Sequence, residues 1–184
     1  MTTDDTRTSK LLSYVLRHHP DAAGVTLDPQ GWVDVDALLR GLNARGTVLT
    51  RTDLDRIVAA DRKGRYAYSD DGARIRANQG HSVEVDLGYE PAVPPALLYH
   101  GTAEPNVASI MATGLDRRER HHVHLSAAVA TARQVGGRHG RPVVLNVDAA
   151  RMHADGFAFF VTANGVWLVE RVPPAYLTVP ALAR

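Results

Sequence analysis

The stretch at residues 65–76 reads RYAYSDDGARIR and predicts a β-hairpin. Its Asp71-Gly72 pair stands between two short runs in which apolar and polar residues alternate, which is a strong hairpin signal. Three short helices are expected before the hairpin, and their predicted N-terminal caps are Ser9, Asp34 and Thr52. Helices followed by a hairpin form the pattern of a winged helix, a fold that binds nucleic acids or other proteins.

The pattern changes after the prolines at positions 91, 94 and 95. From there, short apolar runs typical of strands alternate with segments of helical periodicity. Strands are expected at 97–99, 122–125, 143–147, 157–161 and 166–169. Helices are expected over about 104–113, ended by Gly114, and from Ser126 to near Gly136. We therefore predict an α+β chain with a winged-helix lobe at 1–80 and a mixed α/β lobe at 81–184.

Composition limits the possible classes of protein. The chain has 184 residues, enough for one ordinary domain or two small ones, and its 45% apolar content is typical of globular proteins. No apolar run is long enough to span a membrane and the N-terminus is unlike a signal peptide, so we expect no membrane association and a cytoplasmic location. The absence of cysteine excludes disulfides and thiolate zinc sites. The net charge of +1 is uninformative, but all cations except Lys10 and Lys63 are arginines, which suit forked contacts with phosphate.

The run IRANQGHS at residues 75–82 carries a cation, two amides, an imidazole and a hydroxyl. Only Ile75 and Ala77 are suited to a core. Gly80 allows a positive φ or a close backbone approach to a ligand. The run therefore predicts a piece of a binding site, with Arg76, Gln79 and His81 as candidate substrate contacts.

Other candidate positions each have a structural explanation as well. Arg17-His18 at the end of the first helix would complement the helix dipole. Arg65 could be an exposed strand arginine, and Arg120 could lie in a solvated loop. Taken singly, each of these explanations is the simpler one.

His100-Gly101-Thr102 is expected to follow a strand and to open a helix. A glycine there would let a ligand approach, and the helix start would offer free N–H groups to an anion; a plain turn with a threonine cap is the alternative. His122 and His124 would share one face of a strand, but only Glu119 lies near them as a further ligand, so we expect no metal. The sequence contains no phosphate-binding loop of the Walker type, no dinucleotide-binding glycine motif and no serine-hydrolase elbow.

Taken together, these segments resemble the NAD-dependent RNA 2'-phosphotransferase family. The resemblance extends from Ser9 to about Val179, in the family's order. Its pieces are SKLLS at 9–13 running into LRH at 16–18, GWV at 31–33, KGRY at 63–66, IRANQGHS at 75–82, YHGT at 99–102, RHHVHLS at 120–126 and NGVWL at 164–168. Tyr66 stands where the family often has phenylalanine.

The resemblance implies an N-terminal winged-helix lobe that binds RNA and an ADP-ribosyltransferase-like lobe that binds NAD. It also implies a reaction in which an internal RNA 2'-phosphate attacks the nicotinamide ribose of NAD. The ADP-ribosylated RNA then resolves into 2'-OH RNA and ADP-ribose 1'',2''-cyclic phosphate. RNA with an internal 2'-phosphate is thus the expected partner and NAD the expected co-substrate, with no metal. The sequence does not fix the oligomeric state, and a monomer is expected.

The family's catalytic set matches Arg17, His18, Arg65 and Arg120. His19 extends the Arg-His pair, and His18 is chosen because it directly follows Arg17. The resemblance further implies NAD contacts by five residues, which are His100, Gly101, Thr102, His124 and Ser126. Arginines can hold a phosphate through both steps, and a histidine can move a proton near neutral pH.

Two other classes of function remain open at this stage. A one-step ADP-ribosyltransferase would use the same NAD site and stop at the adduct, on terminal phosphates of nucleic acids or on a protein. A non-catalytic winged-helix protein would bind nucleic acid and consume no NAD. The second alternative leaves Arg120 and His100-Gly101-Thr102 unexplained.

Overall fold

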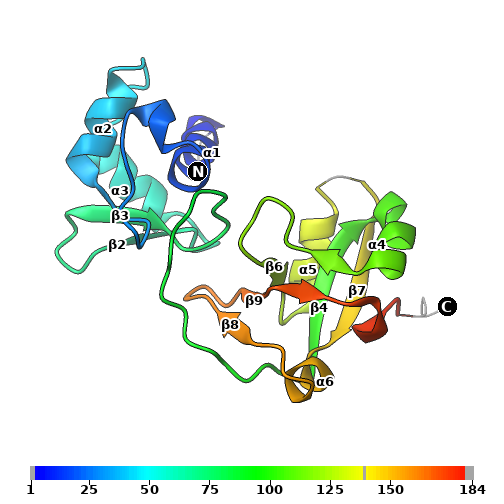
Figure 1. The fold of residues 1–184 in the computed structure, drawn as a ribbon. Coiled ribbons are helices and arrows are strands. Elements are labelled where there is room, and N and C mark those ends of the chain that lie inside the picture. The colour runs from blue at the N-terminus through cyan, green and yellow to red at the C-terminus, as the bar shows by residue number, and fades with distance from the viewer. Residues whose placement is uncertain (1–2, 139, 181–184) are drawn as a thin grey trace. The chain divides into compact units, whose positions relative to one another are not determined.

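A computed structural model describes residues 3–138 and 140–180. The chain divides into two compact units, Met1–Gly88 and Tyr89–Arg184 (Figure 1). Each unit has its own hydrophobic core. We predicted the boundary after residue 80. The segment 81–88 belongs to unit 1 instead, because its backbone is bonded there: Ser82 N donates to Arg17 O (2.9 Å) and Asp86 N to Pro29 O (2.7 Å).

Unit 1 contains three α-helices and a small sheet, as the sequence predicted. The helices are α1 (Thr3–Arg17), α2 (Val35–Asn43) and α3 (Arg51–Ala59), and a 3-10 turn, η1 (Pro20–Ala23), follows α1. Apolar residues at helical spacing, among them Leu12, Leu38 and Leu54, are fully buried in the shared core. The mixture of helices and strands in the two units confirms the α+β class.

The helix caps were predicted with mixed success. Asp34 caps α2 as expected, because its carboxylate accepts from Ala37 N at 2.7 Å. Thr52 does not cap α3. Thr50 does, in a reciprocal capping box with Asp53. Ser9 lies buried inside α1 rather than at its start, and its hydroxyl is 3.0 Å from Tyr66 Oη.

The predicted hairpin is present and forms most of the sheet in unit 1. Strands β2 (Tyr66–Tyr68) and β3 (Arg74–Ala77) pair antiparallel across a turn in which Gly72 has a φ of +67°. The short strand β1 (Val33–Asp34) pairs with the other edge of β3. Ile75 and Ala77 point into the core, so the intervening Arg76 lies on the other face of the strand.

Unit 2 is built on two three-stranded antiparallel sheets. In one, β7 (Pro142–Asp148) lies between β4 (Leu97–Ala103) and β11 (Leu177–Thr178). In the other, β9 (Trp167–Val169) lies between β6 (Val123–Leu125) and β8 (Phe159–Val161). The remaining elements are the strand pair β5 (Leu115–Asp116) and β10 (Arg171–Val172), the helices α4 (Val107–Thr113), α5 (Val129–Gly136) and α6 (Ala149–Ala154), and the 3-10 turns η2 (Glu104–Asn106) and η3 (Pro174–Tyr176).

Two local predictions in unit 2 were wrong. His100-Gly101-Thr102 lies inside β4, which continues to Ala103, so this tripeptide does not open a helix and offers no helix-start N–H groups. Ser126 does not cap α5, whose N-cap is Ala128. Ser126 instead exchanges backbone hydrogen bonds of 2.8 and 2.9 Å with Tyr99, and this single bridge joins β4 to the end of β6.

A close crossing of α5 over β4 explains the glycine of the tripeptide. A Cβ atom on Gly101 would lie 1.6 Å from Ala132 O, so only glycine lets the helix backbone approach the strand. Gly136 is constrained in return, because its Cβ would lie 2.7 Å from Thr102 O.

In the part of the chain that the structure describes, no helix is long and apolar enough to cross a membrane.

Candidate active site

The predicted pair Arg17 and His18 lies at the C-terminal end of α1, where the 75–82 run reaches it. The carbonyl of Arg17 accepts hydrogen bonds from the backbone N–H groups of Ser82 (2.9 Å) and Val83 (3.4 Å). His18 Nδ1 lies 2.9 Å from Ser82 Oγ. The neighbouring His19 is instead stacked on Tyr14, with 4.6 Å between the ring centroids. Ser82 therefore fixes both the backbone and the imidazole of the predicted pair.

Arg65, at the entry to β2, is held by the same run. Asn78 N donates to Arg65 O at 2.8 Å, and Asn78 Nδ2 donates to Gly64 O at 2.7 Å. The run 75–82 thus hydrogen-bonds to the chain at Arg17 and at Arg65, two of the predicted catalytic positions. Asn78 and Ser82 were not predicted as site residues, and only the density of polar groups in the run could have drawn attention to them.

The three predicted substrate contacts lie in or next to β3. Arg76 has its guanidinium 4.4 Å from the ring centroid of Trp32 and donates from Nη1 to Gln30 O. Gln79 and His81 are 9% and 2% exposed, and Gly80 between them has the expected positive φ, +85°. Among the described residues, Gln79 Oε1 and Arg76 Nε are buried without a hydrogen-bond partner. An unsatisfied buried polar group is costly, so these two atoms are candidates for contact with a ligand or water.

In unit 2, Arg120, His124 and His100 form a chain of contacts. Arg120 Nη1 lies 3.3 Å from His124 Nδ1, and His100 Nδ1 lies 3.3 Å from the carbonyl of His124. An arginine can only donate and a carbonyl can only accept. Neutral His124 therefore carries its proton on Nε2, whereas neutral His100 carries it on Nδ1 and has an acceptor at Nε2. The two imidazoles thus differ in tautomer.

Charge and burial shift the pKa values in this group. Burial lowers the pKa of His100, and the charge of Arg120 lowers it further, against the opposing effect of the bond to His124. Arg120 is exposed at its surface, yet desolvation by the surrounding protein lowers its pKa, and the charge of Arg138 adds to this effect. Burial likewise lowers the pKa of His122. Arg120 and Arg138 make this part of unit 2 electropositive, and the lowered pKa values favour neutral imidazoles at His100 and His122, which suits this region to an anionic ligand.

The lowered pKa of His100 predicts a pH-dependent stability. Below its ordinary value of 6.5, the unfolded chain binds more protons at this position than the folded chain does, so the free energy of unfolding falls as the pH falls. We expect lower stability in urea at pH 5 than at pH 7.5. His100→Asn should flatten this dependence, and the exposed His153→Asn should not. An unchanged slope in His100→Asn would contradict the assignment.

The other predicted NAD contacts have clear structural surroundings. Gly101 accommodates α5, which accounts for the glycine without a ligand. Thr102 is 7% exposed, and its hydroxyl lies 3.4 Å from Asn106 Nδ2. Ser126 lies at the Tyr99 bridge that links the two sheets. Contact of these residues with NAD stays a prediction.

Unit 1 thus contains Arg17, His18, Arg65 and the predicted substrate contacts, while unit 2 contains Arg120 and the predicted NAD contacts. In residues 3–138 and 140–180, no group of three or more His, Asp or Glu residues is placed so that it could hold a metal ion.

Comparison with known proteins identifies the family. Residues 3–171 match the sequence model described as RNA 2'-phosphotransferase, Tpt1 / KptA family. The chain belongs to the RNA 2'-phosphotransferase family. Similar proteins named as probable RNA 2'-phosphotransferases occur in Nostoc punctiforme (54% identity, covering 92% of this chain and 93% of the relative) and Agrobacterium fabrum (55%, covering 96% and 95%). One from Streptomyces coelicolor is 52% identical over 95% of both chains.

Membership of the RNA 2'-phosphotransferase family confirms the resemblance drawn from the motifs. The match extends through both units, from α1 to the start of β10. Transferase chemistry on RNA is therefore the general function of the family to which both units belong.

Proposed function

We propose that this protein is an NAD-dependent RNA 2'-phosphotransferase, which removes an internal 2'-phosphate from RNA. The observation that carries the proposal is that one segment, residues 75–82, hydrogen-bonds to Arg17, His18 and the backbone at Arg65. The chain in which this occurs belongs to the RNA 2'-phosphotransferase family. Arginine groups held in this way suit a phosphate that first attacks and is later transferred. In this proposal unit 1 is a winged-helix RNA-binding lobe and unit 2 an ADP-ribosyltransferase-like lobe.

In the first proposed step, an oxygen of the RNA 2'-phosphate attacks C1'' of the nicotinamide ribose of NAD. The new bond to carbon forms as the bond to nicotinamide breaks, and nicotinamide leaves with the bonding electrons. The phosphate is already anionic, so this step needs no base. The arginines of the predicted catalytic set balance the charge of the phosphate.

In the second proposed step, the 2''-OH of the ADP-ribose attacks phosphorus and the RNA 2'-oxygen leaves. The proton of the 2''-OH is removed, and a proton is delivered to the departing oxygen. His18 is suited to assist these transfers, because an imidazole titrates near neutral pH. The products are 2'-OH RNA and ADP-ribose 1'',2''-cyclic phosphate.

Unit 2 would supply the contacts to NAD. With the different tautomers, His100 would offer an acceptor and His124 a donor, a combination suited to ribose hydroxyls, which both donate and accept. Arg120 would bind phosphate oxygens. A cytoplasmic location is part of the same proposal, since NAD and RNA are both available there.

The test is incubation of the protein with a short RNA that carries one internal 2'-phosphate, with and without NAD, in the presence of a chelator. We expect 2'-OH RNA, nicotinamide and the cyclic phosphate only when NAD is present. An RNA–ADP-ribose adduct that accumulates would instead indicate a one-step ADP-ribosyltransferase. Failure to release nicotinamide would contradict both activities and favour a non-catalytic nucleic acid-binding protein.

A further inference from the structure

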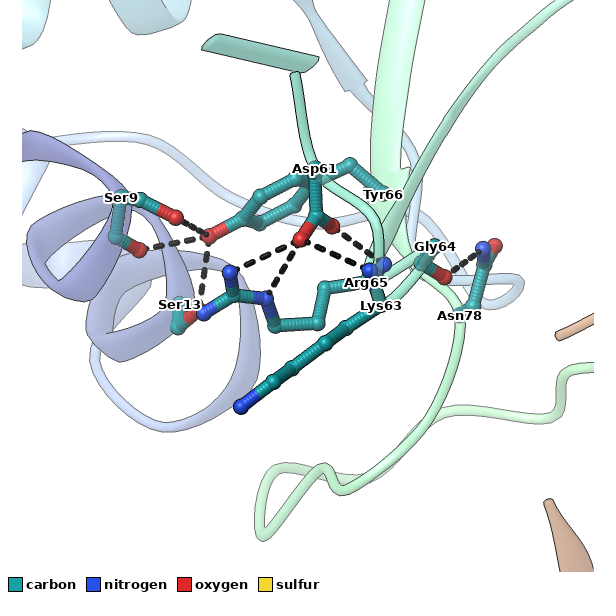
Figure 2. A network of polar contacts seen from close by, with 8 residues as sticks. All are labelled: Ser9, Ser13, Asp61, Lys63, Gly64, Arg65, Tyr66 and Asn78. Atoms are coloured by element: carbon teal, nitrogen blue, oxygen red, sulfur yellow. Dashed lines mark hydrogen bonds and ion pairs between the residues drawn. The ribbon is translucent and has the colours of Figure 1, made fainter. Parts of the chain in front are cut away.

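Asp61 is a buried carboxylate to which the chemistry above assigns no role. Its side chain is 2% exposed, whereas that of its partner Arg65 is 25% exposed. Oδ1 accepts hydrogen bonds from Arg65 Nε (2.9 Å) and Nη2 (2.8 Å), and Oδ2 accepts from the backbone N–H of Arg65 (Figure 2). A carboxylate is almost never buried unless it is paired, so the contact with Arg65 accounts for the burial of Asp61.

This contact leaves one end of the guanidinium available. The edge formed by Nε and Nη2 faces Asp61, and among the described residues Nη1 has no hydrogen-bond partner. Nη1 and the second hydrogen of Nη2 form the terminal fork of the side chain. A fork of two N–H groups is the arrangement that binds two oxygens of one phosphate.

The backbone around Arg65 is fixed as well. The loop from Asp61 closes through a hydrogen bond from Gly64 N to Asp61 O (2.9 Å), and Gly64 has a φ of +53°. The next residue, Tyr66, lies with its hydroxyl 2.7 Å from Ser13 Oγ, which ties the start of β2 to α1 (Figure 2). Asp61 therefore contributes one of several hydrogen bonds that hold the main chain at Arg65, through Oδ2, and its Oδ1 holds the guanidinium in one direction.

We propose that Asp61 is a positioning residue that orients the terminal fork of Arg65 toward the RNA 2'-phosphate. This inference rests on the proposed function, because it gives Arg65 a phosphate to bind. Asp61 does not touch the substrate in this scheme. It holds Arg65 in one rotamer, so that the fork meets the phosphate without a search among side-chain conformations.

Neutralisation of Asp61 is expected to have opposite effects on the binding of RNA and on the rate of the reaction. A negative carboxylate behind Arg65 opposes the binding of a phosphate, so its neutralisation should preserve or strengthen the binding of RNA. If Asp61 orients Arg65, the same change should slow the reaction, because the fork is no longer fixed for the transition state. Asp61→Asn should thus lower kcat without raising KM for RNA.

The experiment compares Asp61→Asn with Asp5→Asn. Asp5 is the matched control, since its side chain is 8% exposed and is ion-paired with Arg56 in the same unit. With 2'-phosphorylated RNA and NAD, we expect kcat of Asp61→Asn to fall about 10- to 100-fold, the scale of a small misplacement, with KM for RNA equal to or below that of the wild type. Asp5→Asn should keep its kcat within about three-fold of wild type, as expected of a purely structural pair.

Several results would overturn the inference. They are a kcat of Asp61→Asn within about three-fold of wild type, an equal loss in Asp5→Asn, or a loss that appears as a raised KM for RNA alone. If Asp61→Asn does not fold, Asp61→Glu retains the charge but shifts the guanidinium, and a wild-type kcat there would also overturn it. A wild-type protein that fails to turn over RNA would instead contradict the proposed function, so the two failures are distinguishable.

Discussion

Replacement of Arg120 by alanine is expected to lower kcat for RNA dephosphorylation by about 10²- to 10³-fold, the usual cost of removing one group that stabilises charge in a transition state. Arg120 is exposed, so the change should alter the free energy of unfolding by no more than about 0.5 kcal/mol. The measurement is single-turnover conversion of 2'-phosphorylated RNA at saturating NAD, with urea unfolding beside it. Arg17→Ala should cause a loss of the same size.

Arg117→Ala is the matched control for Arg120. Arg117 is an exposed arginine in the same segment, and its carbonyl accepts a hydrogen bond from Arg120 N, which alanine at position 117 preserves. Removal of this charge three residues away should keep kcat within about three-fold of wild type, since exposed charges are largely screened. Equal losses of kcat in both variants would mean that activity depends on the positive charge of this segment and not on Arg120 in particular. Full activity in Arg120→Ala would contradict the role assigned to Arg120.

Replacement of Gly101 by alanine is expected to destabilise the protein by about 3 kcal/mol or more, the upper range for a steric overlap that the structure cannot relax easily. The new Cβ would lie 1.6 Å from Ala132 O and 2.5 Å from Ala132 C, and both are backbone atoms of α5. The helix would have to move off β4. Urea unfolding followed by circular dichroism measures the loss, and Trp167 in β9 is a local fluorescent probe in unit 2.

Gly137→Ala is the control for this change. Gly137 follows α5 directly, has a φ of −69°, and a Cβ there would lie 3.4 Å from its nearest neighbour, Arg133 O, which is an ordinary contact. Alanine should therefore be tolerated at position 137 and should stabilise the protein slightly, by up to about 1 kcal/mol. Wild-type stability of Gly101→Ala would mean that α5 and β4 do not cross as closely as described.

The sequence predicted elements well where the signal was local. The Asp71-Gly72 turn, the Asp34 cap and the Gly114 stop are all present, because each depends on the conformational preference of one or two residues. The choice between Thr50 and Thr52 was not decided locally, since each has an aspartate three residues later. In the structure Asp55 bonds to Tyr68 of β2 and to Arg51 one turn earlier in α3, and it does not complete a capping box with Thr52.

The sequence predicted residues of the candidate site but not the neighbouring residues that hold them in place. Motif resemblance pointed to Arg65, yet nothing near Asp61 in the sequence marks it as the partner of that guanidinium. The tripeptide at 100–102 was expected to follow a strand and to open a helix, with its glycine making room for a ligand. In the structure β4 continues through the tripeptide, and Gly101 makes room for α5, which packs on the strand. This contact joins segments about 30 residues apart, so the local sequence does not reveal it.

The hydrogen bonds of Ser82 and Val83 to the last carbonyl of α1 also have a consequence for the order of folding. These bonds join residues about 65 positions apart in the chain, so they form only once the chain between them has been made. During synthesis, α1 can form long before Arg17 and His18 acquire their final surroundings. A fragment that ends at Gly80 would contain the residues of all three helices and of the hairpin but not Ser82 and Val83, whose hydrogen bonds complete the end of α1. The surroundings of Arg17 and His18 are therefore complete only when residues 82 and 83 have been made.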